Sequence, residues 1–367
     1  MRILENLGLS FDDVAMIPQY SCVESRSDVD LTMKLYTSDP EVIYSFDLPV
    51  ISSPMSTVTE DEMAFRMYIN GGLGIIHRFN TIEEQVALVE SAHKKYEKFY
   101  YDIGAPLQNF SNSDFICGAA IGATGDYIER CQALIQAGVK IICVDIAHGN
   151  HLIMKEALTE LKKIIPKHIH IMASSVADAN GFMNFEIWGA HSARIGISSG
   201  GNCSTFLATG HGLPTFQSLI DCRKFRFNPK FGLIADGGMR YPGDIVKSFG
   251  AGATMCILGS MLAGTKAAPG HIIKTDDGRW TKEHRGSASE ANQKLRGIKN
   301  PKVEGVSALV PYKGKVENVL QSIKDGLQSG CSYSGVWRLE EMHAKAIFQQ
   351  ITQSGYIQGT PHILTRK

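Results

Sequence analysis

FICGAAIGATGDYIERCQALIQAGVKIICVDIAHG, residues 115–149, contains two short apolar runs separated by an amphipathic segment. The apolar runs, 115–122 and 141–149, have the length of strands that are buried on both faces, as in a parallel sheet covered by helices. The segment between them carries apolar residues at helical spacing. This order predicts a strand, a helix and a second strand parallel to the first.

The same pattern recurs along the chain and predicts a (β/α)8 TIM barrel. Apolar runs, each followed by a small or polar residue and an amphipathic stretch, lie at 49–55, 72–78, 115–122, 141–149, 169–176, 192–200, 231–238 and 254–260. Eight strand–helix units in about 210 residues fit a closed barrel, and an open doubly wound sheet is the alternative. We expect one catalytic domain, 1–367, with a flap and C-terminal segment in 265–367.

Two capping boxes mark the start of predicted helices, Thr59 with Glu62 and Thr81 with Glu84. Residues 95–115 read as a polar connector.

The overall composition gives no indication of a nucleic-acid or membrane partner. The chain has 44% apolar residues, and its 37 basic residues balance 37 acidic ones, so nothing global favours binding to nucleic acid or to an anionic membrane. No apolar run approaches the roughly 20 residues that span a bilayer, and the N-terminal residues do not resemble a signal peptide. A cytoplasmic protein with no membrane or nucleic-acid partner is expected.

The eight cysteines are scattered, and none forms a C-x-x-C pair, so zinc ribbons and thioredoxin-like sites are not expected. Most should be reduced and buried. Cys203 differs, because it lies in the loop SSGGNCST (198–205) after the sixth predicted strand. Glycines let a backbone approach a ligand, and an exposed thiol there is a candidate nucleophile. A flexible turn with an ordinary cysteine is the alternative.

The other strand ends carry further candidates, since barrel active sites lie at the C-terminal ends of the strands. DGGMRYPGD (236–244) and GSMLAG (259–264) follow strands seven and eight, where barrels commonly bind a phosphate on backbone N–H groups. Asp236 is placed to accept the hydroxyls of a ribose. DIAHG (145–149) adds Asp145 and His148, although a lone histidine there is more often structural. No metal-ligand spacing is present.

Ordered motifs resemble the inosine-monophosphate dehydrogenase and GMP reductase family, through almost the whole chain. They are LSFDDV…P (9–18), SSPMSTVTE (52–60), GGLGIIHR (71–78), DGGMRYPGDI (236–245) and GSMLAGT (259–265). The loop around Cys203 resembles the family pattern G-x-G-S-x-C-x-T. Many dehydrogenases of the family insert regulatory modules after the second helix, and the connector here has no room for them.

The resemblance implies one of two related reactions, both through a thioether between the nucleophile and purine C2. The dehydrogenase oxidises IMP with NAD⁺ and hydrolyses the adduct with a long flap bearing an Arg-Tyr pair. The reductase expels ammonia from GMP and takes hydride from NADPH, with a shorter flap. Here fourteen residues separate Ser289 from Glu304, with Arg296 but no Arg-Tyr pair. This favours GMP reductase, with NADPH as the cofactor that the resemblance implies; the choice between NADPH and NADH stays open.

Matching the family residue by residue assigns roles to this chain. Cys203 and Thr205 act on C2, and Glu304 forms a proton relay with Thr124. The nucleotide side of the site is expected at Ser53, Arg78, Asp236, Gly237, Gly238, Gly259, Ser260, Gly286 and Ser287. The nicotinamide is expected beside Asp145, Ala147 and His148, and a monovalent cation, K⁺, on the carbonyls of Ser198, Gly200 and Cys203.

Several residues depart from the reductase pattern. Arg stands for Lys at 78, Ser for Asn at 175, Ser for Asp at 56, His for Tyr at 284, and Ser-Ser for Gly-Pro at 198–199. These positions flank the base or the sugar, so the choice between ribo- and deoxyribonucleotides stays open. An IMP dehydrogenase and a catalytically silent purine-nucleotide-binding relative are the alternatives. The resemblance also implies a homotetramer.

Overall fold

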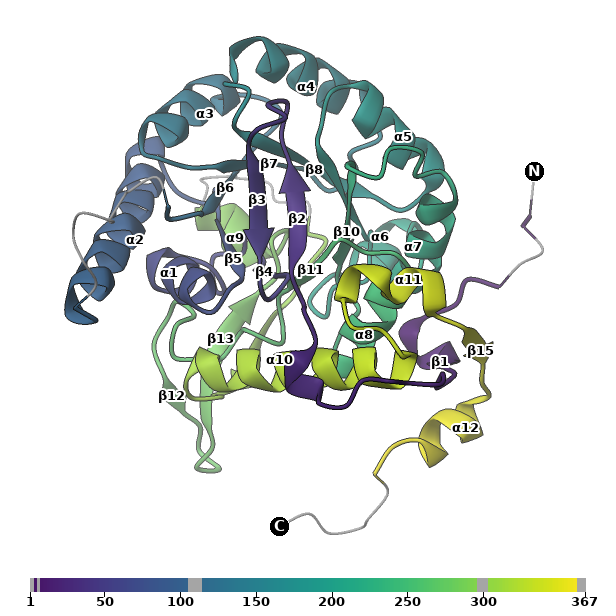
Figure 1. Cartoon of the computed structure of the whole chain (residues 1–367). Coiled ribbons are helices and arrows are strands. Elements are labelled where there is room, and N and C mark those ends of the chain that lie inside the picture. Colours follow the sequence, from purple (N-terminus) through teal and green to yellow (C-terminus); the bar gives the residue numbers. More distant parts are fainter. Residues whose placement is uncertain (1–2, 5–6, 105–113, 296–302, 362–367) are drawn as a thin grey trace.

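Eight parallel strands close into a barrel in the computed structural model, which describes residues 3–4, 7–104, 114–295 and 303–361 (Figure 1). Each strand lies inside one of the eight predicted runs. In chain order they are β4 (Val50–Ser52), β5 (Leu73–Ile76), β6 (Gly118–Ile121), β7 (Ile141–Asp145), β8 (His170–Val176), β9 (Ser192–Ile195), β10 (Gly232–Asp236) and β11 (Met255–Leu258). Pairing of β11 with β4 closes the barrel. The predicted TIM barrel is confirmed, and the open sheet is excluded.

Helices cover the outside of the barrel. They are α1 (Asp61–Ile69), α2 (Ile82–Asp102), α3 (Tyr127–Gln136), α4 (Leu152–Ile164), α5 (Ala179–Ile187), α7 (Thr215–Lys224), α8 (Pro242–Gly250) and α10 (Val316–Ser334). The last of these comes from the C-terminal segment and packs closely on α8, where a Cβ on Gly330 would lie 2.6 Å from a methyl group of Val246. On its other side, Glu317 accepts a hydrogen bond from Arg66 of α1 at 3.2 Å. The C-terminal segment therefore completes the ring of helices.

Shorter elements close the barrel at its two ends. The hairpin β2 (Met33–Tyr36) and β3 (Ile43–Phe46) lies across the barrel, and its Leu35 and Phe46 are buried in the interior core (Figure 1). A small sheet is formed by β12 (Ile273–Lys274), β13 (Trp280–Arg285) and β14 (Ser307–Pro311). The segment between β13 and β14, residues 286–306, is the flap, and it includes α9 (Glu290–Leu295). The remaining elements are α6 (Thr205–Thr209), α11 (Met342–Lys345), α12 (Gln353–Gln358) and the pair β1 (Val14–Met16) and β15 (Phe348–Gln350).

One of the two predicted capping boxes is confirmed. Thr81 Oγ1 accepts from the backbone of Glu84, and the Glu84 carboxylate accepts from the Thr81 backbone at 2.9 Å. The box at Thr59 is wrong, because the Thr59 hydroxyl donates to the carbonyl of Ser53 at 2.7 Å and the helix begins only at Asp61. The predicted connector is also partly wrong, since α2 continues to Asp102.

No helix among the described residues combines the length and the apolar character that crossing a membrane requires.

Two buried histidines at the N-terminal end of the barrel predict a loss of stability in acid. His170 donates from Nδ1 to the Tyr36 carbonyl at 2.7 Å, and burial, with His191 nearby, lowers its pKa to about 3. Burial and the charge of Lys162 lower the pKa of His191 to about 4. Above about pH 6.5 both folded and unfolded chains hold neutral imidazoles. Below it the unfolded chain binds protons first, so the free energy of unfolding should fall by on the order of a few kcal/mol.

Thermal unfolding between about pH 7 and pH 4.5 tests this prediction. The midpoint should fall steadily below about pH 6.5. A His168→Gln variant is the control, because His168 lies at the same end of the barrel but is exposed, and it should follow the same curve. A midpoint that does not change across this range would contradict the assignment of the buried pair.

Candidate active site

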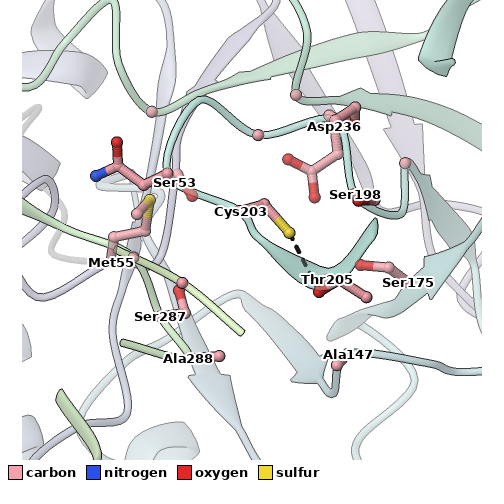
Figure 2. A pocket seen from close by; sticks show the side chains of 18 of the residues that line it. Ser53, Met55, Ala147, Ser175, Ser198, Cys203, Thr205, Asp236, Ser287 and Ala288 are labelled. Carbon is pink, nitrogen blue, oxygen red and sulfur yellow. Dashed lines mark hydrogen bonds between the residues drawn. The ribbon is translucent and has the colours of Figure 1, made fainter. Parts of the chain in front are cut away.

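A cavity of about 340 Å³ opens at the C-terminal ends of the barrel strands, a size suited to a small-molecule ligand. It is lined by most of the predicted site residues: Ser53, Arg78, Asp145, Ala147, Ser198, Gly200, Cys203, Thr205, Asp236, Gly237, Gly238, Gly259, Ser260, Gly286, Ser287 and Glu304. Figure 2 shows Cys203 between Ser53 and Asp236, with Thr205 and Ser287 nearby. The fold therefore gathers residues from eight different loops and strand ends into one site.

Cys203 is the exposed thiol of this cavity. All eight cysteines are free, and only Cys22 and Cys203 among them are exposed. Burial holds the others as thiols; it raises the pKa of Cys143 to about 11, for example, with smaller effects from its charged neighbours. The prediction that most cysteines are buried and reduced is confirmed. Cys203 is the cysteine that a ligand in the cavity can reach.

A directed chain of hydrogen bonds connects this thiol to a carboxylate. Cys203 Sγ donates to Thr205 Oγ1 at 3.3 Å, the contact drawn in Figure 2. Thr205 Oγ1 in turn donates to Glu304 Oε2 at 2.8 Å. A proton that leaves the thiol thus has a path through one hydroxyl to one acceptor. Such an arrangement of nucleophile and base is what covalent catalysis requires.

Backbone pairing places Glu304 beside Cys203. Its carbonyl accepts the N–H of Ser204 at 3.0 Å, and the N–H of Val306 donates to the Asn202 carbonyl at 2.9 Å. Gly305, between them, approaches so closely that an added Cβ would lie 3.2 Å from the Asn202 oxygen. The flap is therefore attached on both sides of the carboxylate to the loop 198–205, which we call the nucleophile loop because it carries the candidate nucleophile Cys203.

Glycines allow the nucleophile loop to pack directly on the Asp236 loop. A Cβ on Gly196 would lie 1.9 Å from the Asp236 carbonyl oxygen, and one on Gly237, where φ is +80°, would lie 2.8 Å from Ser199 Oγ. Ser198 is itself in the left-handed region, at φ +69°, and its hydroxyl accepts the N–H of Phe206 at 2.7 Å. A serine thus occupies a position whose backbone conformation favours glycine, and its hydroxyl gains a contact with the first turn of α6.

The predicted phosphate corner is assembled from the ends of β10 and β11. Gly237, Gly238, Gly259 and Ser260 line the cavity together with His284. His284 is buried, and burial, with the charge of Lys313, lowers its pKa to about 4. Its Nδ1 lies 3.2 Å from the hydroxyl of Thr57.

Two predicted residues lie outside the main cavity. Thr124 is exposed in an adjoining hollow that shares Arg78, Phe79 and Ile146 with the main cavity, while the hydrogen bond of Glu304 is with Thr205. His148 is exposed after β7. Arg296, which entered the comparison of flaps, lies outside the described residues.

Two polar groups were not predicted from the sequence, one in the wall of the cavity and one in the flap. Arg194 lies within β9, lines the cavity and is only 6% exposed. A charged residue inside a strand that is otherwise small and apolar was the available signal, because arginine is rarely buried unless it is paired. Asn292 of α9 accepts a hydrogen bond from the hydroxyl of Ser56 at 2.7 Å. The two residues are 236 positions apart in the sequence, so no local pattern indicates their contact.

The nucleophile loop offers neutral carbonyl oxygens, the type of ligand atom that binds a monovalent cation. The loop curls so that Cys203 N–H donates to the Gly200 carbonyl at 2.9 Å, and Ser198 has a left-handed conformation. Carbonyl oxygens without carboxylates suit K⁺ better than a divalent or transition metal. Among the described residues no group of three or more His, Cys, Asp or Glu side chains is placed to hold a metal.

Comparison with known proteins identifies the family. A family model described as the IMP dehydrogenase / GMP reductase domain matches residues 8–362. The chain is 31% identical to human GMP reductase 2, over 96% of this chain and 97% of that protein. It is 33% identical to the inosine-5'-monophosphate dehydrogenase of Cryptosporidium parvum, over 97% and 95%.

A solved structure agrees with these relatives. A cysteine-to-alanine variant of GMP reductase from Trypanosoma brucei, in complex with guanosine 5'-monophosphate, superposes with a TM-score of 0.87 at 26% identity and covers 98% of both chains. The barrel, the cavity and these likenesses agree, and this chain belongs to the IMP dehydrogenase and GMP reductase family of oxidoreductases of purine nucleotide metabolism.

Proposed function

We propose that this protein is a GMP reductase, which converts GMP with NADPH to IMP, ammonia and NADP⁺. The observation that carries the proposal is the chain from Cys203 through Thr205 to Glu304, at 3.3 and 2.8 Å. A reductase must deliver a proton to a departing amine, and a carboxylate within hydrogen-bond reach of the reacting centre supplies it. The relatives named GMP reductase support the same reaction.

Nucleotide binding is assigned to the two sides of the cavity. The glycine turns after β10 and β11 provide backbone N–H groups for the phosphate, and the side chains of Ser53 and Ser260 provide hydroxyl groups. Asp236 provides a carboxylate oxygen for the ribose hydroxyls. In this assignment purine C2 faces Cys203, and the base lies beside the flap residues Gly286 and Ser287, which line the cavity.

In the first chemical step the proton of Cys203 passes through Thr205 to Glu304. The sulfur attacks purine C2, the C2–S bond forms and the C2–N bond breaks. Glu304 returns the proton to the amino group, which leaves as ammonia, so atoms and charges balance. An amine leaves poorly unless it is protonated, and general acids of this kind contribute about 10²–10⁴-fold.

In the second step hydride adds to C2, and the C2–S bond breaks to release IMP and the Cys203 thiolate, which takes up one proton from solvent before the next turnover. NADPH supplies this hydride when it is bound beside Asp145, Ala147 and His148. Thr124 borders the adjoining hollow, and we assign it to the relay as the partner of Glu304 when the cofactor is present. K⁺ on the carbonyls of Ser198, Gly200 and Cys203 would stiffen the nucleophile loop. A cytoplasmic homotetramer completes the proposal.

A nucleotide panel tests the proposal. Purified protein is mixed with GMP, dGMP, IMP or XMP and with NADPH, NADH, NAD⁺ or NADP⁺, and absorbance of the reduced cofactor is followed. We expect consumption of NADPH with GMP. Reduction of NAD⁺ with IMP and no reaction with GMP would instead establish a dehydrogenase. Binding of GMP without any turnover would identify a silent relative.

A further inference from the structure

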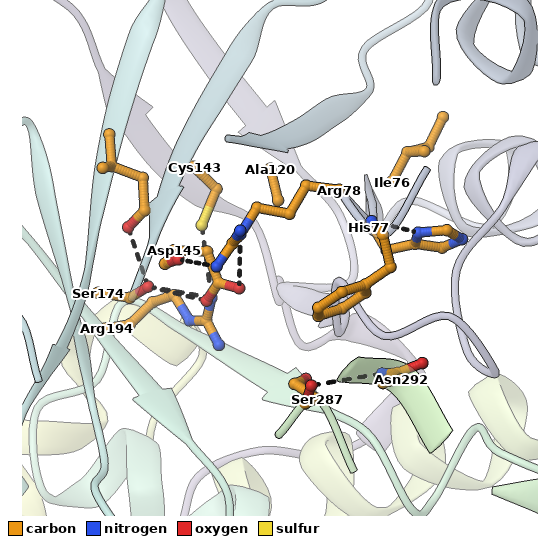
Figure 3. Close-up of polar contacts among 12 residues, drawn as sticks. Ile76, His77, Arg78, Ala120, Cys143, Asp145, Ser174, Arg194, Ser287 and Asn292 are labelled. Carbon is orange, nitrogen blue, oxygen red and sulfur yellow. Dashed lines mark hydrogen bonds and ion pairs between the residues drawn. The ribbon is translucent and has the colours of Figure 1, made fainter. Parts of the chain in front are cut away.

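Arg194 is a buried cation in the barrel interior at the floor of the cavity. Its guanidinium donates from Nε and Nη2 to Asp236 Oδ2 at 3.1 and 2.7 Å, and from Nη1 to Asp145 Oδ1 at 2.9 Å. Nη1 also lies 3.2 Å from the hydroxyl of Ser174. Figure 3 shows Arg194 pointing to Asp145 and Ser174, with Cys143 beside them. One side chain of β9 thus connects the ends of β10 and β7.

Arg194 contacts only one oxygen of each carboxylate, and the second oxygen of each makes no contact with Arg194. Among the described residues Asp236 Oδ1 has no hydrogen-bond partner, and Asp145 Oδ2 lies 3.7 Å from Arg78 Nε in an ion pair. Both Asp145 and Asp236 line the cavity. The guanidinium group is planar, and its N–H groups point in fixed directions. A carboxylate that it holds at one oxygen therefore presents its second oxygen in a fixed direction.

The cluster needs its arginine for electrostatic reasons. Two carboxylates that converge at one barrel end repel each other, and a buried charge without a partner is strongly unfavourable. Burial alone would lower the pKa of Arg194, yet the negative charges beside it, above all Asp236, raise its pKa well above the usual value. The guanidinium therefore stays charged and holds both carboxylates.

We propose that Arg194 is the positioning residue that aims Asp236 at the nucleotide ribose and Asp145 at the nicotinamide cofactor. The inference rests on the proposed function, which assigns those two ligands to the two carboxylates. Arg194 acts through its partners. Its replacement should therefore weaken the binding of both ligands and should reduce the discrimination that Asp236 exerts on the ribose.

Arg194→Lys tests the proposal, because lysine keeps the charge but lacks the fork. Hydrogen bonds between charged groups are strong enough that KM for GMP should rise about ten- to a hundredfold. KM for NADPH should rise as well. The preference for GMP over dGMP should fall, since dGMP lacks the 2′-hydroxyl that Asp236 accepts. A merely structural role would weaken GMP and dGMP equally and leave their ratio at the parent value.

Arg226→Lys is the matched control. Arg226 is also partly buried and donates to the carbonyls of Phe231 and Pro229 at 2.8 and 2.7 Å, but at the opposite end of the barrel. We expect this variant to keep the parent KM values and the parent ratio. Equal changes of the KM values and of the GMP to dGMP ratio in Arg194→Lys and Arg226→Lys would overturn the proposal.

A charge-balanced variant serves if Arg194→Lys does not fold. Arg194→Gln combined with Asp145→Asn removes one positive and one negative charge together and leaves Asp236 beside an amide donor. The same loss of ribose preference is expected. The role of Arg194 would be refuted if the parent protein reduces GMP and prefers it to dGMP, and the variants keep the same preference. A parent that does not reduce GMP would refute the proposed function instead.

Discussion

Replacement of Cys203 by serine is expected to abolish GMP turnover while nucleotide binding survives. Serine is close to cysteine in size, but its hydroxyl is a far weaker nucleophile than a thiol, and loss of the covalent route should cost several orders of magnitude. The phosphate and ribose contacts do not involve the sulfur, so the affinity for GMP should change little. Steady-state turnover and calorimetric titration with GMP measure the two effects separately.

Cys22→Ser is the matched control for this variant, because Cys22 is the other exposed cysteine of the chain and does not line the cavity. It should retain the parent rate. Near-parent turnover by Cys203→Ser would contradict a covalent mechanism and would reduce Cys203 to an ordinary residue of a flexible turn.

Replacement of Glu304 by glutamine should slow ammonia release by about 10²–10⁴-fold and spare the hydride step. The glutamine carbonyl can still accept the Thr205 hydroxyl, which Glu304 Oε2 accepts at 2.8 Å, so the geometry is preserved. It cannot carry a proton, and the amine then leaves unprotonated. Single-turnover ammonia release gives the first rate directly. The isotope effect of deuterated NADPH on turnover should shrink, because ammonia release then limits the reaction.

Glu290→Gln provides the comparison for Glu304→Gln. Glu290 lies on the same flap, with its side chain 58% exposed in an ion pair with Lys294. Its replacement should leave both steps unchanged. If Glu304→Gln releases ammonia at the parent rate, the carboxylate has no part in the reaction, and the main mechanistic reason for preferring the reductase is lost.

The barrel was predictable because its signals are local. Each strand, such as β7 at Ile141–Asp145, is a buried run whose pattern is complete within a few residues. The position of Cys203 at a strand end followed from the same periodicity, since the chemistry of a barrel lies at that end. Family motifs added the identities of the residues around it.

The rest of the site depends on contacts that no local pattern contains. Glu304 comes beside Thr205, 99 positions away, through backbone pairing of the flap with the nucleophile loop. Arg194 carried a local signal, but its two partners lie 49 and 42 positions away. Thr59 shows that two local patterns can also compete: its hydroxyl donates to the carbonyl of Ser53, six positions earlier, and does not cap the helix.

Transfer of deuterium from NADPH to IMP shows directly whether this protein carries out a reductive deamination of GMP. The protein is incubated with GMP and with NADPH deuterated at the transferable position, and the products are analysed by mass spectrometry. A reductive deamination through Cys203 predicts IMP with one deuterium at C2 and one ammonia for each NADPH oxidised. IMP without deuterium, or GMP and NADPH recovered unchanged by an enzyme that oxidises IMP with NAD⁺, would contradict it.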